Sequence, residues 1–322
     1  MTSSSDVAAT LQSKLSFSTL GCPDWTWNEI LEFGPRFGFA GVEIRLLARE
    51  VDLLACAEFQ PSRLSASCNE LRSAGLQVCG LASSVRFHDP DPQVRRNHIE
   101  TGKRYLELAV ELDAGFVRVF GDVIPEDARL HPDQIEASLC WIADGLNQLG
   151  EFAFSCQRQI AIETHGDFAD SLLMERLMQK VYSPAIGVLW DTHHPWRFFG
   201  EEIGSTFERL KRWTFHTHWK DSLPISPENT SHENVISHGG YRERIAADLQ
   251  ARELMSGHRP SHYVLMGEGE FPTSQALKLL IEHGYTGWLS LEWEKMWHPE
   301  LADPQIAFPA FVRQLYSALS RF

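Results

Sequence analysis

Three acidic residues and one histidine in the second half of the sequence stand at the ends of apolar segments, where they could together hold a divalent metal ion. They are Glu163, Asp191, His218 and Glu292. The segments that lead to them favour β-strands, so each polar group is expected to face the mouth of a sheet. The interval from Glu163 to Asp191 nearly equals that from Asp191 to His218, and each fits one strand, one helix and two loops. The spacing therefore predicts that the ligands come from successive βα units.

Carboxylates combined with one imidazole suit a hard or borderline divalent ion, with Mn²⁺ as the first choice and Mg²⁺, Co²⁺ or Zn²⁺ as alternatives. The three carboxylates carry a formal charge of −3, so a bound divalent ion would leave about −1. That charge favours a neutral substrate that chelates through adjacent hydroxyl and carbonyl oxygens, such as a sugar. Polarising the carbonyl acidifies the neighbouring C–H, and Glu163 and Glu292 could act as base and acid on the two faces of a cis-enediolate.

Further polar residues around these ligands are candidates for substrate contacts. His194, three residues after Asp191, is expected to contact substrate or a metal-bound water, with a structural role near Pro195 as the alternative. His165 has the strand parity of Glu163 and is predicted to line the pocket. His216 has the parity of His218 but should lie one layer deeper, as a hydrogen-bonded core residue.

Lys220 continues past the strand of His218 and is included among the substrate-binding candidates, as is Glu268 near the rim. Asp221 is expected to position a loop, and Glu294 is a weaker catalytic candidate than Glu292. Three more candidates come from the first half of the sequence and are Glu43, Arg45 and Arg86. Glu43 and Arg45 either bind a substrate hydroxyl or pair with each other.

Eight strand-like segments separated by helical patterns predict an α/β fold, a (β/α)8 TIM barrel whose chemistry lies at the carboxyl ends of the strands. The segments are short and nearly continuously apolar, as is typical of parallel strands covered on both faces. They are residues 14–20, 41–47, 76–82, 116–121, 159–164, 185–191, 213–219 and 287–292, and helices are predicted at 26–38, 61–75, 94–115 and 273–284. A doubly wound open sheet is the alternative, but the first strand lacks a glycine-rich phosphate turn.

The barrel is predicted to span residues 14–322 as a single domain, preceded by a frayed N-terminal tail over residues 1–13. Residues 222–262 are too long for an ordinary connection after the seventh strand. This insertion is expected to be either a lid over the mouth or an oligomer contact, which leaves a homo-oligomer open.

Composition restricts the class of protein further. The 322 residues are 43% hydrophobic and carry a net charge of −14 without a basic stripe, which argues against a nucleic-acid partner. No apolar run is long enough for a membrane span, and the polar N-terminus lacks a secretory signal. Six cysteines without metal-binding spacing are expected to be reduced and mostly buried. These features predict a cytoplasmic enzyme. That its substrate is a small sugar or cyclitol is inferred from the predicted metal site and from the resemblance described next.

Several ordered motifs resemble those of the xylose isomerase-like TIM barrels, the family of sugar phosphate isomerases and epimerases. The motifs are GVEIR at 41–45, ETHGDF at 163–168, WDTHHP at 190–195, HWKD at 218–221, GEG at 267–269 and LSLEWEKMWHPE at 289–300. The resemblance implies metal binding by Glu163, Asp191, His218 and Glu292, substrate contact by His194, and proton transfer by Glu163 and Glu292. It also implies that His218, which opens the HWKD motif, is the ligand in preference to His216.

Two departures from the family pattern narrow the expected activity. Xylose isomerases proper carry a Lys two residues after the first Glu, whereas this chain has His165 there, so a one-metal proton transfer is favoured over hydride shift. The third and fourth strands lack the His ligands of DNA-repair relatives. The leading hypothesis is a metal-dependent isomerase or epimerase, followed by a metal-dependent lyase or dehydratase acting on a keto-sugar, 3-keto-glycoside or inosose. A noncatalytic sugar-binding barrel is the third, and phosphorylated substrates stay open.

Overall fold

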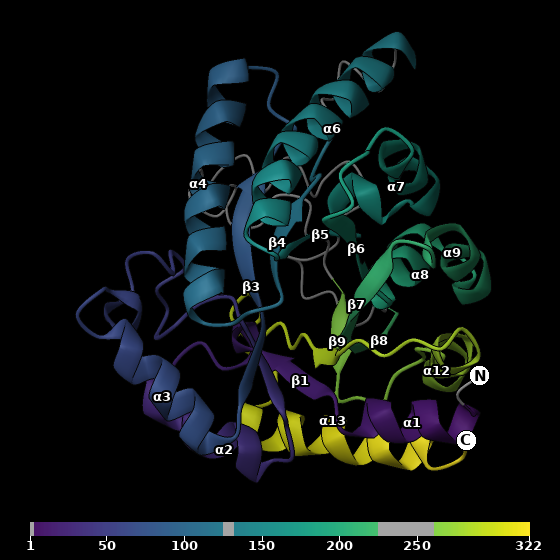
Figure 1. Cartoon of the computed structure of the whole chain (residues 1–322). Coiled ribbons are helices and arrows are strands. Elements are labelled where there is room, and N and C mark those ends of the chain that lie inside the picture. The colour runs from purple at the N-terminus through teal and green to yellow at the C-terminus, as the bar shows by residue number, and fades with distance from the viewer. Residues whose placement is uncertain (1–2, 125–131, 225–260) are drawn as a thin grey trace.

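A closed barrel of parallel strands forms the centre of the molecule, seen here in a computed structural model that describes residues 3–124, 132–224 and 261–322. Neighbouring strands follow the order β1-β10-β7-β6-β5-β4-β3-β2, and β2 pairs with β1 to close the sheet (Figure 1). Because the sheet closes on itself, the doubly wound alternative is wrong. The predicted (β/α)8 barrel is confirmed.

Seven of the eight predicted strand segments contain one strand of the barrel, and the strand predicted at 76–82 continues beyond its predicted end to Arg86. These strands are β1 (Leu15–Ser18), β2 (Gly41–Ile44), β3 (Gln77–Arg86), β4 (Phe116–Phe120), β5 (Gln159–Glu163), β6 (Ile186–Asp191), β7 (Thr214–Trp219) and β10 (Leu289–Leu291). Most of their residues are fully buried, because helices cover the outside of the barrel and side chains fill the inside.

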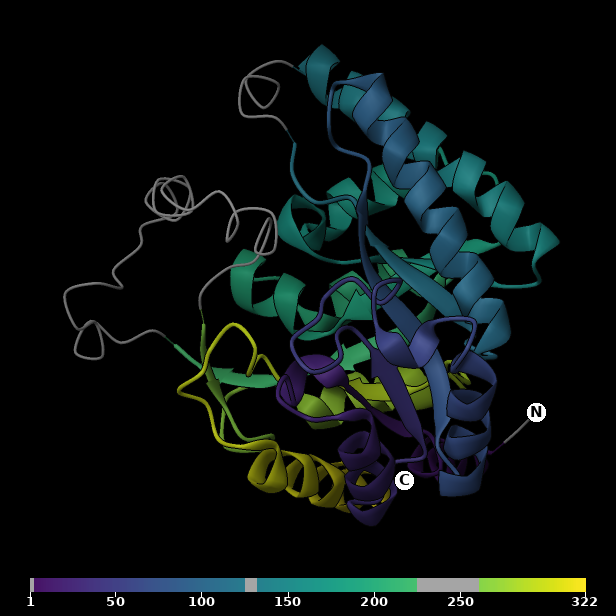
Figure 2. The same cartoon turned by 90° about the vertical axis from the view of Figure 1, so that its left-hand side faces the viewer.

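Helices surround the barrel, and in Figure 2 the long helices α4 and α6 run side by side across one flank. Within the described ranges the α-helices are α1 (Ser4–Gln12), α2 (Trp27–Arg36), α3 (Leu64–Ala74), α4 (Pro92–Glu111), α6 (Pro132–Ser155), α7 (Ser171–Met178), α8 (His193–Phe199), α9 (Ile203–Leu210), α12 (Thr273–Glu282) and α13 (Pro304–Leu319). Short 3-10 turns are η1 (Thr19–Gly21), η2 (Ala57–Phe59) and η3 (Gly166–Ala169).

The four helices predicted from the sequence all form, and local signals explain where they begin and end. Thr26 and Glu29 make a reciprocal capping box at the start of α2. Asp91 caps α4 and is followed by Pro92, whose fixed φ suits the first turn. Gly75 ends α3 in the left-handed region with φ of 68°.

Residues 4–12 form helix α1, so the predicted frayed tail over residues 1–13 is wrong for that part. Ser3 and Asp6 make a capping box, and Val7, Ala8 and Leu11 are buried. In Figure 1, α1 lies alongside α13, which it contacts, and it also contacts α12. The apolar stripe on this helix belongs to the main buried hydrophobic cluster and therefore stabilises the fold.

The insertion after the seventh strand leaves and rejoins the barrel through a small antiparallel hairpin. Strand β8 (Asp221–Leu223) pairs with β9 (His262–Val264). Residues 225–260, on which the predicted lid or oligomer contact would depend, lie outside the described residues. That prediction stays untested.

The six cysteines are all unpaired, as expected, but only Cys22, Cys56 and Cys79 are buried, and Cys140 is exposed. In the described parts of the chain, no helix has both the length and the apolar character needed to cross a bilayer.

Candidate metal centre and active site

The strand register brings the four predicted ligands to one end of the barrel. Glu163 ends β5, Asp191 ends β6 directly beside His218 of β7, and Glu292 follows β10. One oxygen or nitrogen atom from each of the four side chains lies within 4.8 Å of the others. All four residues are buried. This arrangement gives a divalent ion four donors from four adjacent strands.

Hydrogen bonds identify the ring nitrogen that His218 would offer to an ion. Its Nε2 lies 2.9 Å from Oε2 of Glu43, so Nε2–H donates to that carboxylate and Nδ1 is the nitrogen left for an ion. Nδ1 lies 3.2 Å from Glu292 Oε2 and 3.5 Å from Glu163 Oε1. Glu43 therefore fixes both the tautomer and the direction of the ligand.

The unsatisfied atoms of this cluster also fit a cation. Glu163 Oε2, Asp191 Oδ2 and His218 Nδ1 are all buried without a hydrogen bond, although Arg118 and Lys220 lie near the two carboxylates. Buried polar atoms are normally paired, and an ion among them would satisfy all three. Residues and geometry thus suit a divalent ion, and the donor set alone does not select manganese.

The pKa values of Asp191 and His218 reflect the repulsion among the buried carboxylates of this cluster, which a cation would relieve. Burial and the nearby carboxylates of Glu292 and Glu163 raise the pKa of Asp191 to about 6, although Lys220 opposes this. Burial lowers the pKa of His218, but Glu292 and Glu43 outweigh it and hold that pKa well above its usual value. A proton on His218 partly replaces the positive charge of a metal.

Lys220 supplies the second positive charge next to the ligands. Its Nζ lies 2.7 Å from Asp191 Oδ2, 2.5 Å from Glu292 Oε2 and 2.9 Å from Glu294 Oε1. Burial lowers the pKa of this fully buried ammonium, but Asp191, Glu292 and Glu294 raise it well above its usual value. Lys220 lies behind these carboxylates, and it is not among the residues that line the cavity described below.

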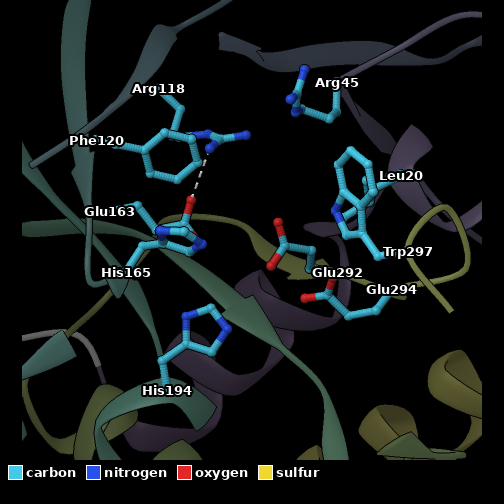
Figure 3. Close-up of a pocket in the computed structure, with 10 residues that line it drawn as sticks. All are labelled: Leu20, Arg45, Arg118, Phe120, Glu163, His165, His194, Glu292, Glu294 and Trp297. Carbon is cyan, nitrogen blue, oxygen red and sulfur yellow. Dashed lines mark ion pairs between the residues drawn. The ribbon is translucent and has the colours of Figure 1, made fainter. Parts of the chain in front are cut away.

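A cavity of about 350 Å³, part of it open to solvent, lies in front of the ligands (Figure 3). It has the size of a small hydroxylated ring or chain. Of the predicted site residues, Glu163, Glu292, His165, His194 and Arg45 line it. The remaining lining residues are Leu20, Arg118, Phe120, Glu294 and Trp297.

His194 is held by three contacts as a neutral imidazole. Its Nδ1 lies 3.1 Å from the carbonyl oxygen of Thr164, to which it donates, and its Nε2 lies 3.1 Å from Lys220 Nζ. Its backbone N–H donates to Asp191 Oδ1. Burial and then the charge of Lys220 lower the pKa of His194 well below its usual value. It is therefore an uncharged wall of the cavity.

His165 presents one ring nitrogen to a buried carboxylate. Its Nδ1 lies 3.6 Å from Oδ1 of Asp122, which is fully buried just beyond β4. Since Nδ1 faces Asp122, Nε2 is the nitrogen available to the cavity. Arg86, a predicted substrate contact, and His88 approach the other oxygen of Asp122 at 3.7 Å and 3.9 Å. Arg86 thus lies behind the cavity wall.

Glu43 and His216 lie beneath the ligands and not in the cavity. His216 Nε2 is 2.9 Å from the same Glu43 oxygen that accepts from His218. The predicted core role of His216 agrees with this contact. Glu43 neither lines the cavity nor forms an ion pair with Arg45 among the described residues, so both predicted alternatives for Glu43 are replaced by a role behind His218.

Glu268 is exposed on the loop after β9, away from the lining residues. The Asp221 carboxylate holds this loop, as expected, by accepting bonds from the backbone N–H groups of Gly267, Gly269 and Phe271. A Cβ on Gly269 would lie 2.1 Å from Asp221 Oδ1. The Asp221 carboxylate of the HWKD motif therefore binds the backbone of Gly267 and Gly269 in the GEG motif, which links the two motifs.

Arg118, Phe120, Leu20 and Trp297 are site residues that sequence reasoning missed. Arg118 lies in the middle of β4 with Nη1 3.3 Å from Glu163 Oε2, and its guanidinium stacks on Phe120 at 3.9 Å from the ring centroid. A single Arg inside the apolar segment FVRVF was the available signal, because a buried charge requires a partner.

The fold is a closed (β/α)8 barrel, and at one end of it lies a group of side chains that suits a divalent ion. The sequence matches the xylose isomerase-like TIM barrel family over residues 32–309. The chain belongs to this family, and the resemblance stated from its motifs is confirmed.

Individual relatives are more distant. An inosose dehydratase from Clostridium botulinum is 25% identical over 185 residues, which cover 57% of this chain and 53% of that protein. The chain thus spans about half the length of this curated relative. Among solved structures, the IOLI protein with a bound zinc atom has a TM-score of 0.72 at 17% identity, covering 96% of this chain and 99% of that one. The 3-keto-D-glucoside 4-epimerase YcjR from E. coli has a TM-score of 0.67 at 14% identity, covering 94% and 99%. At these identities the two structures show the shared fold alone.

Proposed function

We propose that this protein is a divalent-metal-dependent lyase that removes water from a small keto-sugar or keto-cyclitol. The observation that carries the proposal is a pair of proton-transfer groups that are separate from the four predicted ligands. His165 and Glu294 both line the cavity and lie on different sides of it (Figure 3). The curated relative with the matching segment is an inosose dehydratase, which supports the same class of reaction.

Glu163, Asp191, His218 and Glu292 would hold the ion. The ion would polarise a ketone and acidify the neighbouring C–H. Glu163 and Glu292, which the sequence suggested as base and acid, are poor proton carriers. Arg118 and His218 lower the pKa of Glu163 despite its burial. His218 and Lys220, against burial, hold the pKa of Glu292 well below its usual value.

His165 is the group that we assign as the base. Its Nδ1 side is occupied by Asp122, so Nε2 can accept the proton from the carbon next to the carbonyl. The carboxylate of Asp122 stabilises the imidazolium that forms. This division of roles needs no proton transfer by a residue bound to the ion.

Glu294 is the group that we assign as the acid. Burial and Glu292 raise its pKa, and Lys220 only partly opposes this. In the elimination, the C–H electron pair forms the new C=C bond while the C–O bond at the next carbon breaks. The departing hydroxide takes the proton of Glu294 and leaves as water. His165 ends protonated and Glu294 ionised, and proton exchange through solvent and Lys220, 2.9 Å from Glu294, restores both.

A second candidate function is the isomerase or epimerase that the sequence favoured. The observation that favours this function is that Glu163 and Glu292, from two different strands, belong to the same cluster of side chains. The low pKa of both carboxylates counts against them as interchangeable base and acid, and reversible epimerisation requires each group to serve in both roles.

Incubation of the metal-loaded protein with a panel of ketoses and inososes in D₂O, followed by NMR, distinguishes these functions. The proposal predicts a product that has lost one water molecule. A product that keeps every hydroxyl, carries deuterium and has an inverted or shifted centre would establish the isomerase and overturn the lyase. Unchanged sugars that nonetheless bind would point to the noncatalytic barrel.

A further inference from the structure

Two buried guanidinium groups share the cavity wall that lies away from Glu294 and His194. Figure 3 shows Arg45 and Arg118 on this side, both directed toward the space between them. Arg45 follows β2 and is 4% exposed, and Arg118 in β4 is 2% exposed. Charged side chains this buried normally have an anionic partner.

Arg45 lacks such a partner in the described part of the chain. Its Nη2 lies 3.1 Å from Oγ of Ser84, a neutral acceptor. Its Nη1 is buried without a hydrogen-bond partner. Within the described ranges no carboxylate lies within ion-pair distance of it. A guanidinium that lines a cavity with an unsatisfied N–H group is ready to bind an anion there.

Arg118 increases the need for an anion at Arg45, because it places a second positive charge nearby. Glu163 pairs with one of its nitrogens, but its Nε is buried without a partner. Burial and then the charge of Arg118 lower the pKa of Arg45 to about 10, so Arg45 stays charged near neutral pH. Two cations facing each other in a buried space are stabilised when an anion lies between them.

We propose that the substrate carries a carboxylate that binds between Arg45 and Arg118, so that the enzyme acts on an acidic keto-sugar or keto-cyclitol. The inference rests on the proposed function, because it places the carbonyl end of the same substrate at the ligand cluster. The carboxylate site borders the metal ligands where Arg118 pairs with Glu163, and the proposal assigns the acid group and the reacting carbonyl to different parts of the substrate.

A carboxylate fits this wall better than a phosphate. Arg118 is already partly neutralised by Glu163, which leaves one full charge on Arg45 for a monoanion. The neighbouring wall residues Leu20, Phe120 and Trp297 are apolar or aromatic and offer few further donors to a dianion.

Three compounds that differ only at carbon 6 test the proposal, namely D-fructose, D-fructuronate and D-fructose 6-phosphate. Calorimetry on the metal-loaded protein gives their dissociation constants. The carboxylate site predicts that fructuronate binds at least about tenfold more tightly than fructose, as expected of a charge-assisted bidentate contact. Equal binding of the acid and the neutral sugar would overturn the proposal, as would tighter binding of the 6-phosphate.

Substitution of Arg45 tests whether the preference for fructuronate depends on this residue. Arg45→Gln should abolish the preference for fructuronate, and Arg45→Lys should retain part of it because the charge remains. Arg72→Gln, at an exposed position on α3, is the control and should keep the wild-type ratio. A full preference in Arg45→Gln would place the carboxylate elsewhere and refute the site.

Binding is the only readout, so the test is independent of the reaction. Failure of the lyase proposal would leave the ratio of dissociation constants as predicted. Loss of the ratio would leave metal-dependent dehydration standing, with a neutral substrate.

Discussion

In the proposed function, individual residues divide the work of this site into holding an ion and moving protons. Glu163 and Glu292 would hold the ion together with Asp191 and His218, whereas His165 and Glu294 line the cavity and lie outside that set. The proposed chemistry depends on this separation, because a carboxylate bound to a cation is a weak base. Substitutions at the two kinds of residue should therefore have different effects.

Glu294→Gln should block water loss while hydrogen exchange persists. The amide cannot donate a proton to the leaving hydroxyl, so dehydration should fall by about 10²–10⁴-fold. His165 remains able to take the carbon-bound proton, so deuterium should still enter the substrate, as NMR would detect. The exposed Glu300→Gln is the matched control. Equal loss of exchange and dehydration in Glu294→Gln would contradict the separate roles of acid and base.

Glu43→Gln should weaken metal binding although Glu43 does not contact the ion. Its carboxylate accepts from Nε2 of His218, and loss of that bond removes the force that orients Nδ1. A drop of about 10–100-fold in affinity is expected for such a supporting residue. Competition with a chelating dye measures it, and Glu107→Gln, at an exposed position, should leave the affinity unchanged. Wild-type affinity in Glu43→Gln would show that the ligand needs no such support.

Metal affinity should increase with pH. Asp191 has a pKa raised to about 6, and that of His218 is raised well above its usual value. Both groups bind protons more readily here than in solution, and each proton must leave before the ion can bind. Below pH about 6 the affinity should fall by up to about tenfold per pH unit for each proton released. Titration at several pH values in two buffers would reveal the proton release, and a flat profile from pH 5 to 8 would contradict it.

At the residue scale, the sequence predicted well which four side chains the fold brings together, and it predicted the residues that support them poorly. Ligands at strand ends are visible because the fold brings strand ends together whatever the details of packing. Glu43 and Arg118 lie within strands, where sequence parity alone does not tell whether a charge faces a substrate, a ligand or a neighbouring side chain. Their partners, His218 and Glu163, lie on distant strands and become identifiable only from the barrel register.

At the scale of elements, the loop after β9 shows why the short GEG motif needs glycine, because its backbone packs against Asp221. Asp221 accepts from Gly267 and Gly269, and a side chain at Gly269 would collide with that carboxylate. The conformation of this loop therefore depends on the absence of a Cβ at one position.

Gly269→Ala should lower the free energy of unfolding by about 1–3 kcal/mol, as expected for an inserted methyl group without room. Thermal unfolding provides the measurement. Gly204→Ala is the matched control, because Gly204 lies in α9 with no heavy atom within 4 Å of the added Cβ. That change should instead stabilise by about 0.4–1 kcal/mol. An unchanged melting temperature for Gly269→Ala would show that the loop adapts easily.

Helix α1 shows that a polar N-terminal sequence predicted to be a tail can form a helix. Its first residues are Ser and Asp, which are typical of a polar tail, yet Ser3 and Asp6 form the capping box that starts the helix. The spacing of Val7, Ala8 and Leu11 was the remaining signal. The eight barrel strands were easier to predict, because short apolar segments that recur between helical patterns are typical of buried parallel strands.

Across the whole molecule, the two halves of the barrel supply different parts of the site. The ion ligands come from β5, β6, β7 and the end of β10, which are adjacent in the sheet. Arg45 and Arg118 come from the region of β2 and β4. In the two proposals above, a substrate across the mouth would reach the proposed ligands through its carbonyl and the guanidinium groups through its carboxylate. The net charge of −14 thus gives no indication of the positive charge that Arg45 and Arg118 place in this part of the cavity.

The central claim is that one divalent ion binds Glu163, Asp191, His218 and Glu292 together. A crystal structure of metal-loaded protein, with anomalous scattering recorded at the metal edge, tests it directly. We predict one peak at about 2.0–2.4 Å from an oxygen of each carboxylate and from Nδ1 of His218. A peak at Glu43 and His216, or no peak with Lys220 still bound to Asp191, would contradict the claim.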